Sequence, residues 1–280
     1  VIGVRNDFYH FEVNSNLEEN SGKRSDNMVS PKISFIFGPW AKTEFYLNGG
    51  GGFHSNDARG ITQRVDPSNA NVVTQRVTPL VRTWGYEVGF RTGIIPSLQT
   101  TVSLWQLHVD SELLFVGDAG GTIPSQPSLR RGIEFTNYWR PVNWIIVDAD
   151  LSLSRARFRG NSSIGNYIPG TMSRVASVGV SFDRNNWFGG IRLRHFGPRP
   201  LVKNNSQKGS SSTLVNLRAG YRFVKYLKVS LDIFNLIGSK PNDISYFYQS
   251  KLSGEEEPVA DKHIHPVEPR SFRFTIQASF

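Results

Sequence analysis

The sequence has 280 residues, a net charge of +9 and no cysteine, so disulfides and thiolate metal sites are excluded. Hydrophobic content is ordinary at 38%, and no run of about 18 apolar residues exists, which excludes a transmembrane helix. Lys and Arg are spread along the chain without a run or a basic helix. The charge therefore does not indicate a nucleic-acid partner, and a basic lumen or mouth that attracts anions is favoured instead.

Alternation of apolar and polar residues predicts about twelve extended strands, and no segment has convincing helical periodicity. In chain order they cover residues 1–13, 33–40, 43–53, 84–92, 98–109, 131–139, 145–154, 174–182, 187–196, 213–223, 229–233 and 271–280. Most have roughly ten residues, the length of a strand that crosses a membrane at a tilt. The alternation thus predicts an all-β protein.

The last strand shows the pattern most clearly. Its apolar residues, Phe272, Phe274, Ile276, Ala278 and Phe280, fall on one face of an extended chain, and its polar residues fall on the other. In a soluble sheet the apolar face would cover a core. In an outer-membrane barrel it would face lipid, with the polar face toward the lumen.

The connections between these strands alternate strictly between long and short. Long segments cover residues 14–27, 54–80, 118–127, 158–171, 197–212 and 237–268. Each of the first five is followed by a hairpin with a tight turn, and the last leads into the terminal strand. Aromatic residues lie beside the short turns or at the terminus: Phe37, Trp40, Trp139, Trp144, Phe182, Trp187, Phe223, Tyr226 and Phe280. This alternation of long and short connections, with aromatic residues beside the short turns, predicts an antiparallel transmembrane β-barrel. Its short turns would be periplasmic, its long loops extracellular, and its aromatic residues would form an interfacial girdle.

Few motifs point to catalysis or metal binding. The glycine run 49–52 lacks the strand-turn-helix context and the Lys-Ser/Thr of a phosphate-binding loop, so it is interpreted as a bend or a site of close packing. His263 and His265 share a face but lack an evident third ligand. No Gly-x-Ser-x-Gly elbow is present. We expect no enzyme activity, no metal site and no cofactor.

Charged residues of both signs lie opposite the apolar stripes. They are Glu134, Asp148, Asp150, Arg192, Arg194, Arg218, Arg222, Lys228, Asp232 and Arg273. A narrow barrel would have to pack and pair them, whereas a wide barrel can wet them or set them against a domain that fills the lumen. These residues are therefore expected to face a lumen or a plug.

Several stretches resemble the C-terminal half of the barrel of TonB-dependent outer-membrane receptors. They are Ser30–Ser34, Gly38–Tyr46, Gly52–Gly60, Phe234–Leu236 and Pro269–Phe280. The run Phe53–Gly60, with sequence FHSNDARG, and the terminal strand are the most specific of these. The resemblance extends over the whole of residues 1–280.

The resemblance implies a 22-stranded barrel in the outer membrane of a Gram-negative bacterium, filled by an N-terminal plug. It also implies energised uptake of a scarce nutrient, such as a ferric siderophore or cobalamin, through TonB contacting the plug. The sequence has neither the plug nor the TonB-contacting segment, so we expect it to supply the last twelve strands of a longer receptor, or to be a truncated product. The expected partners are membrane lipid, the plug and the N-terminal barrel strands, TonB through the plug, and the nutrient.

Ligand contacts are expected in the loops. The candidates are His54, Asn56, Asp57 and Arg59 at the mouth of the third strand, and Arg199, Tyr246 and Tyr248 in later loops. Loop stabilisation or plug contact is the alternative role for each. Two other functions stay open at this point: a passive or structural outer-membrane barrel, and a soluble all-β binding module such as a lectin-like sandwich.

Overall fold

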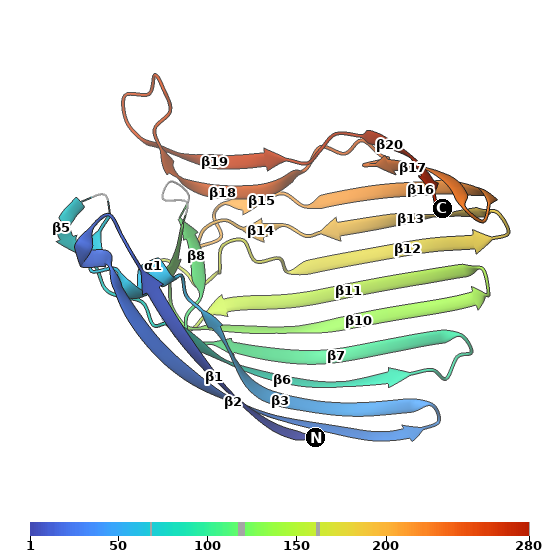
Figure 1. Cartoon of the computed structure of the whole chain (residues 1–280), viewed down its shortest axis with the longest axis horizontal. Coiled ribbons are helices and arrows are strands. Elements are labelled where there is room, and N and C mark those ends of the chain that lie inside the picture. The colour runs from blue at the N-terminus through green and yellow to red at the C-terminus, as the bar shows by residue number, and fades with distance from the viewer. Residues whose placement is uncertain (68, 117–120, 161–162, 280) are drawn as a thin grey trace.

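The computed structural model describes residues 1–67, 69–116, 121–160 and 163–279. Twelve strands form one antiparallel sheet in chain order, open in the part described, with β1 and β20 at its two edges (Figure 1). The strands are β1 Ile2–Val13, β2 Gly22–Trp40, β3 Thr43–Ser55, β6 Leu80–Thr92, β7 Leu98–Val109, β10 Ser128–Val142, β11 Ile145–Phe158, β12 Arg174–Arg184, β13 Trp187–Phe196, β16 Ser212–Val224, β17 Leu227–Phe234 and β20 Ser271–Ala278.

The two ends of these strands differ in the length of their connections (Figure 1). At one end, the short-turn rim, the turns between paired strands are only a few residues long. At the other, the long-loop rim, the connections carry small elements of their own. These are η1 Glu18–Asn20, α1 Ala58–Thr62, and the hairpins β4 Val65–Asp66 with β5 Asn69–Val73, β8 Leu113–Val116 with β9 Gly121–Pro124, β14 Arg199–Pro200 with β15 Lys208–Gly209, and β18 Asn242–Ser250 with β19 Val259–Pro266.

The expected strand number and loop alternation are confirmed, but several expected loops contain regular structure. Residues 22–27, expected as loop, belong to β2 and pair with Phe8–Val13 of β1. The expectation of no helix is wrong at α1, a single turn capped by Asp57. Both departures lie beyond the apolar part of the strands, where water on both sides removes the alternation. Ser68, Asp118 and Phe280 fall outside the described residues.

Within the described ranges, none of the helices has the length and apolar character needed to cross a membrane.

One face of the sheet carries an unbroken apolar belt. Two rows of directly opposed residues make it up: Phe35, Leu47, Val88, Leu104, Ile133 and Leu153 on β2 to β11, and Val147, Val180, Ile191, Leu217, Ile233 and Phe272 on β11 to β20. Phe272, Phe274 and Ile276 are each about two-thirds exposed. A continuous exposed belt of this kind is a surface for a partner or for lipid rather than for water.

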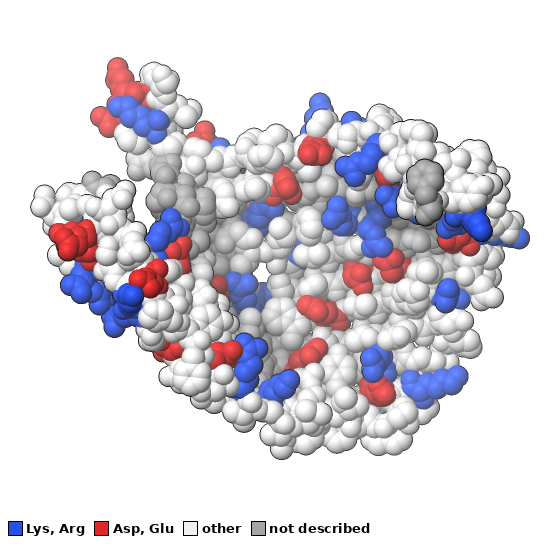
Figure 2. Space-filling model, in the orientation of Figure 1, with Lys and Arg blue, Asp and Glu red and all other residues white. Residues whose placement is uncertain are grey.

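The opposite face, here called the charged face, carries the residues expected to face a lumen. The strand register places all nine site candidates there: Glu134, Asp148, Asp150, Arg192, Arg194, Arg218, Arg222, Asp232 and Arg273. Figure 2 shows a hollowed face with side chains of both signs over the middle strands. From β10 to β20 the wall therefore has one apolar and one charged side.

The glycine run of β3 lies against the aromatic rings of the next strand. A Cβ atom on Gly49 would sit 3.5 Å from the ring of Tyr86, and one on Gly51 would sit 3.5 Å from the ring of Trp84. Small residues here let the two rings lie over β3. This supports the interpretation of the run as a place of close packing rather than a phosphate loop.

Candidate functional site

Three arginine–carboxylate pairs link strands on the charged face, one between neighbouring strands and two across an intervening strand. Arg192 of β13 donates to both oxygens of Asp148 on β11, at 2.7 and 2.8 Å. Arg218 of β16 pairs in the same two-pronged way with Asp232 of β17, at 2.5 and 3.1 Å. Such bidentate pairs fix orientation as well as charge.

The third pair joins β16 to β12 near the short-turn rim, where Arg222 donates to both oxygens of Asp183 at 2.8 and 2.6 Å. Two of the pairs differ in burial: the Asp232 side chain is 8% exposed, whereas that of Asp183 is 62% exposed. The Asp232 pair thus depends more on its partner than the Asp183 pair does.

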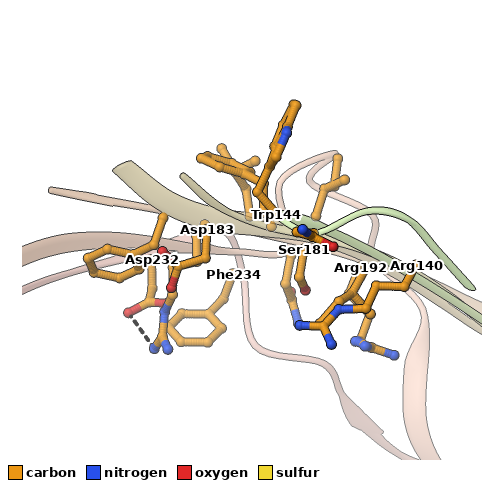
Figure 3. Close-up of a pocket in the computed structure, with 17 residues that line it drawn as sticks. Arg140, Trp144, Ser181, Asp183, Arg192, Asp232 and Phe234 are labelled. Carbon is orange, nitrogen blue, oxygen red and sulfur yellow. Dashed lines mark hydrogen bonds and ion pairs between the residues drawn. The ribbon is translucent and has the colours of Figure 1, made fainter. Parts of the chain in front are cut away.

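A pocket of about 570 Å³ lies over these pairs toward the short-turn rim. Figure 3 shows Arg140, Arg192, Asp232 and Phe234 on one side of the strands, while Trp144 points to the other side. Guanidinium, carboxylate and aromatic groups are therefore presented together. A surface of this kind suits docking of a polar protein segment better than capture of an apolar ligand.

A larger cavity of about 830 Å³ lies at the long-loop rim, and we call it the mouth cavity. Its walls come from four connections: Leu113 and Leu114 of β8, Ile164–Met172 after β11, Leu201–Lys203 after β14, and Ser245–Tyr248 of β18. It combines an apolar lining with the hydroxyls of Tyr246 and Tyr248 and the amine of Lys203. Few polar groups in an apolar concavity are typical of a small-molecule site.

A buried carboxylate braces one side of the mouth cavity. Glu112 is 7% exposed and receives hydrogen bonds from Arg130 at 2.9 and 2.6 Å, and another from the buried hydroxyl of Ser128. The sequence reasoning missed this group. The signal was a lone acidic residue directly before the apolar run Leu113–Val116, a position where a charge has to be paired.

The first group of predicted ligand residues lies at the end of β3, and three of its members have structural partners. Asn56 is 5% exposed and donates to the carbonyl of Thr78 at 2.5 Å. Asp57 caps α1 and pairs with Arg59 at 2.6 Å. Hydrogen bonds from the Arg59 guanidinium lower the pKa of the Asp57 carboxyl.

His54, the fourth member of that group, presents a different picture. Its Nε2 atom is buried without a hydrogen-bond partner among the described residues. The four residues therefore form a local cluster at the β3 end, and none of them lines the mouth cavity. Their role as ligand contacts stays a prediction.

The second group divides in two. Arg199 is 5% exposed and donates to the carbonyls of Asp243 at 2.6 Å and Asn242 at 3.4 Å, which ties β14 to the start of β18. Tyr246 and Tyr248 both line the mouth cavity, and the ring of Tyr248 stacks on His263 at 3.7 Å. The structure thus brings the two tyrosines together at a cavity. Arg199 instead links two loop strands through hydrogen bonds to backbone carbonyls.

The two-histidine segment does not collect further ligands. Ser250 lies 3.2 Å from Nε2 of His263. Across the described part of the chain, no three His, Cys, Asp or Glu side chains are grouped so as to hold a metal ion.

These features define a class: the wall of an antiparallel β-barrel of the membrane-spanning kind, with its loops and cavity at one rim. The family model described as "TonB dependent receptor-like, beta-barrel" matches residues 1–236. The chain therefore belongs to the TonB-dependent receptor β-barrel family, as the resemblance had indicated.

Solved structures show the same fold. The copper transporter OprC superposes with a TM-score of 0.75 at 17% identity, covering 100% of this chain and 44% of that one. The closed form of the ferric-catecholate import receptor Fiu from E. coli K12 gives 0.72 at 15% identity, covering 100% and 42%. The ferric yersiniabactin uptake receptor FyuA from Yersinia pestis gives 0.67 at 16%, covering 92% and 38%.

The chain thus spans about two fifths of the length of these receptors. These family members and structural neighbours are transporters and receptors rather than enzymes.

Proposed function

We propose that this chain forms the C-terminal part of the barrel of an outer-membrane receptor for energised uptake of a scarce nutrient, such as a ferric siderophore or cobalamin. The observation that carries the proposal is the two-sided wall: an apolar belt from β2 to β20 on one face, and on the other face charged residues from β10 to β20, some of them in ion pairs. The belt faces membrane lipid, and the charged face borders a lumen.

The charged face and its pocket serve as the docking surface for a plug. Arg140, Arg192 and Asp232 offer donors and acceptors that water or a polar protein surface can satisfy and lipid cannot. On this proposal the plug, the remaining barrel strands and TonB act together with the chain to move the nutrient across the membrane.

The mouth cavity is the proposed entry site for the nutrient. Tyr246 and Tyr248 can stack on or hydrogen-bond to a ligand, and Lys203 adds a positive charge. His54 remains a further candidate contact because its buried Nε2 lacks a partner within the described structure. Asn56, Asp57, Arg59 and Arg199 support the loops that shape the mouth.

The test is deletion of the coding segment in the parent organism, followed by uptake assays for ferric siderophores, cobalamin and copper. We expect loss of uptake for one nutrient class, and the intact receptor should lose the same uptake when an uncoupler collapses the proton-motive force. Uptake that persists after uncoupling would instead establish a passive barrel. Unchanged uptake of every nutrient would overturn the proposal.

A point variant sharpens the test. In the full receptor, replacing both Tyr246 and Tyr248 by alanine is expected to lower nutrient affinity about tenfold or more, because two aromatic contacts are removed. Tyr226→Ala is the matched control, since Tyr226 lies in a turn at the short-turn rim and is 55% exposed. Equal losses for both variants would remove the mouth cavity from the proposal.

A further inference from the structure

A second cavity, here called the outer groove, lies on the belt side of the sheet and has a volume of about 880 Å³. Its floor consists of apolar and aromatic side chains from four strands: Leu47, Tyr86, Val88, Leu104, Ile133 and Leu153. At its end toward the long-loop rim it is lined by Gln106, Arg131, Arg155 and Arg174. An apolar floor that ends at three guanidinium groups is an amphipathic site.

The strand register holds the three arginines close together on this face. Arg131 of β10 is directly opposite Arg155 of β11, and on its other side it is opposite Gln106 of β7. Arg174 of β12 is opposite Leu153, two residues along from Arg155. Side chains in directly opposed and diagonal positions of neighbouring strands are within reach of each other, and like charges there repel.

No carboxylate relieves this repulsion. Arg131, Arg155 and Arg174 are all exposed, and none makes an ion pair with another described residue. Three arginines of the charged face behave in the opposite way, since Arg192, Arg218 and Arg222 each donate to both oxygens of a carboxylate. Three unpaired cations at one place favour the binding of an anion from outside the chain.

The position of the three arginines along their strands indicates where that anion would bind. On the belt face of β10 the apolar residues are Ile133, Phe135 and Trp139. Arg131 lies four residues from Phe135, toward the long-loop rim, which is about 14 Å along an antiparallel strand. The apolar band of a barrel is about 25 Å tall. The arginines therefore reach the edge of the belt, where lipid headgroups meet the protein.

We propose that the outer groove binds a phosphorylated lipid, with an acyl chain along its floor and a headgroup phosphate held by Arg131, Arg155 and Arg174. Guanidinium groups bind phosphate oxygens bidentately, and basic pockets at membrane boundaries hold anionic headgroups. Gln106, which lies 2.8 Å from His108, adds a neutral hydrogen-bonding group beside them. The inference rests on the proposed insertion of this wall in a membrane.

The experiment uses the full receptor that contains this chain, purified in detergent micelles. Binding of lipid A, a glucosamine lipid with two phosphates, is measured by native mass spectrometry beside the same lipid after enzymatic removal of its phosphates. We expect phosphate removal to weaken binding at least tenfold. The triple variant Arg131→Gln, Arg155→Gln, Arg174→Gln should weaken lipid A binding by a similar factor. Inorganic phosphate at equal concentration should not displace the lipid.

Arg140→Gln is the matched control. Arg140 belongs to the same strand as Arg131 but lies on the charged face, beside Arg192 (Figure 3). Its lipid affinity should equal that of the unchanged receptor. If the triple variant does not fold, the comparison of the two lipids on the unchanged receptor decides the matter alone.

Equal binding of the two lipids, or unchanged binding by a folded triple variant, would overturn the proposal. Full displacement of the lipid by inorganic phosphate would also overturn it, because the site would then select free phosphate. Membrane insertion is checked separately, by a heat-modifiable gel shift in lipid. A receptor that inserts but does not distinguish the lipids fails this inference alone, whereas a receptor that does not insert fails the proposed function.

Discussion

The two faces of the sheet are built from the same twelve strands but satisfy their side chains in different ways. On the belt face, residues such as Leu151 and Phe274 are exposed and need only an apolar surrounding. On the charged face, Asp148, Asp183 and Asp232 each pair with an arginine that lies one or two strands away in the sheet. The alternation of the sequence decides the face, and the register between strands decides the partner.

Placing a charge on the belt face should break this comparison most strongly. Leu151→Arg is expected to destabilise the membrane-folded chain by about 2–4 kcal/mol, because a guanidinium near the middle of the belt has to be removed from water. The measurement is a urea titration of folding into phospholipid vesicles. Asp150→Asn, the neighbouring residue on the charged face, is the control and should change stability little. Equal effects of the two changes would argue against a lipid-facing belt.

Crowding the charged face should have the next largest effect. The ring of Phe188 on β13 occupies the space that a Cβ atom on Gly220 of β16 would need. Gly220→Ala is therefore expected to cost about 1–3 kcal/mol through overpacking. The same urea titration measures it. In Gly85→Ala, on the same face, the new Cβ would lie 3.7 Å from Leu107, so a loss as large as that of Gly220→Ala would contradict the packing argument.

The arginine pairs sharpen the comparison because they differ in burial. Asp232→Asn leaves the Arg218 guanidinium without its carboxylate at a site where the aspartate is 6% exposed, and a loss of about 1.5 kcal/mol is expected. Asp183→Asn removes an exposed pair and should cost less than about 1 kcal/mol. Stability of the two variants is compared in the same vesicles. A larger loss for Asp183→Asn would show that burial does not rank these pairs.

The sequence predicts strand interiors well and strand ends poorly, for a physical reason. Within the belt, lipid on one side and polar groups on the other impose alternation, so residues 98–109 and 187–196 are predicted with their observed bounds. Beyond the belt both sides are wet, and alternation no longer distinguishes strand from loop. The extension of β2 over residues 22–27 and the hairpin of β18 and β19 were missed for that reason.

The site was predictable only in part. Tyr246 and Tyr248 do line a cavity, but Asn56 and Arg199 are buried with backbone carbonyls as partners. From sequence, a polar loop residue that binds the backbone looks the same as one that binds a ligand, because both are polar residues among turn formers. Only the fold shows which carbonyls come within reach.

The smallest expected effect lies in the loop after β3, away from both faces. The pKa of Asp57 is lowered by Arg59, so its stabilising effect on α1 is present above the pKa of an unfolded aspartate, about 3.9. It is lost as the pH falls through the lower folded value. We expect the amide signals of Arg59 and Ile61 to shift between pH 5 and pH 2 by nuclear magnetic resonance. Asp57→Asn keeps a capping side chain but removes the charge, so it should abolish that step. A step of unchanged size in the variant would assign the titration to another group, and α1 would then depend on its cap alone.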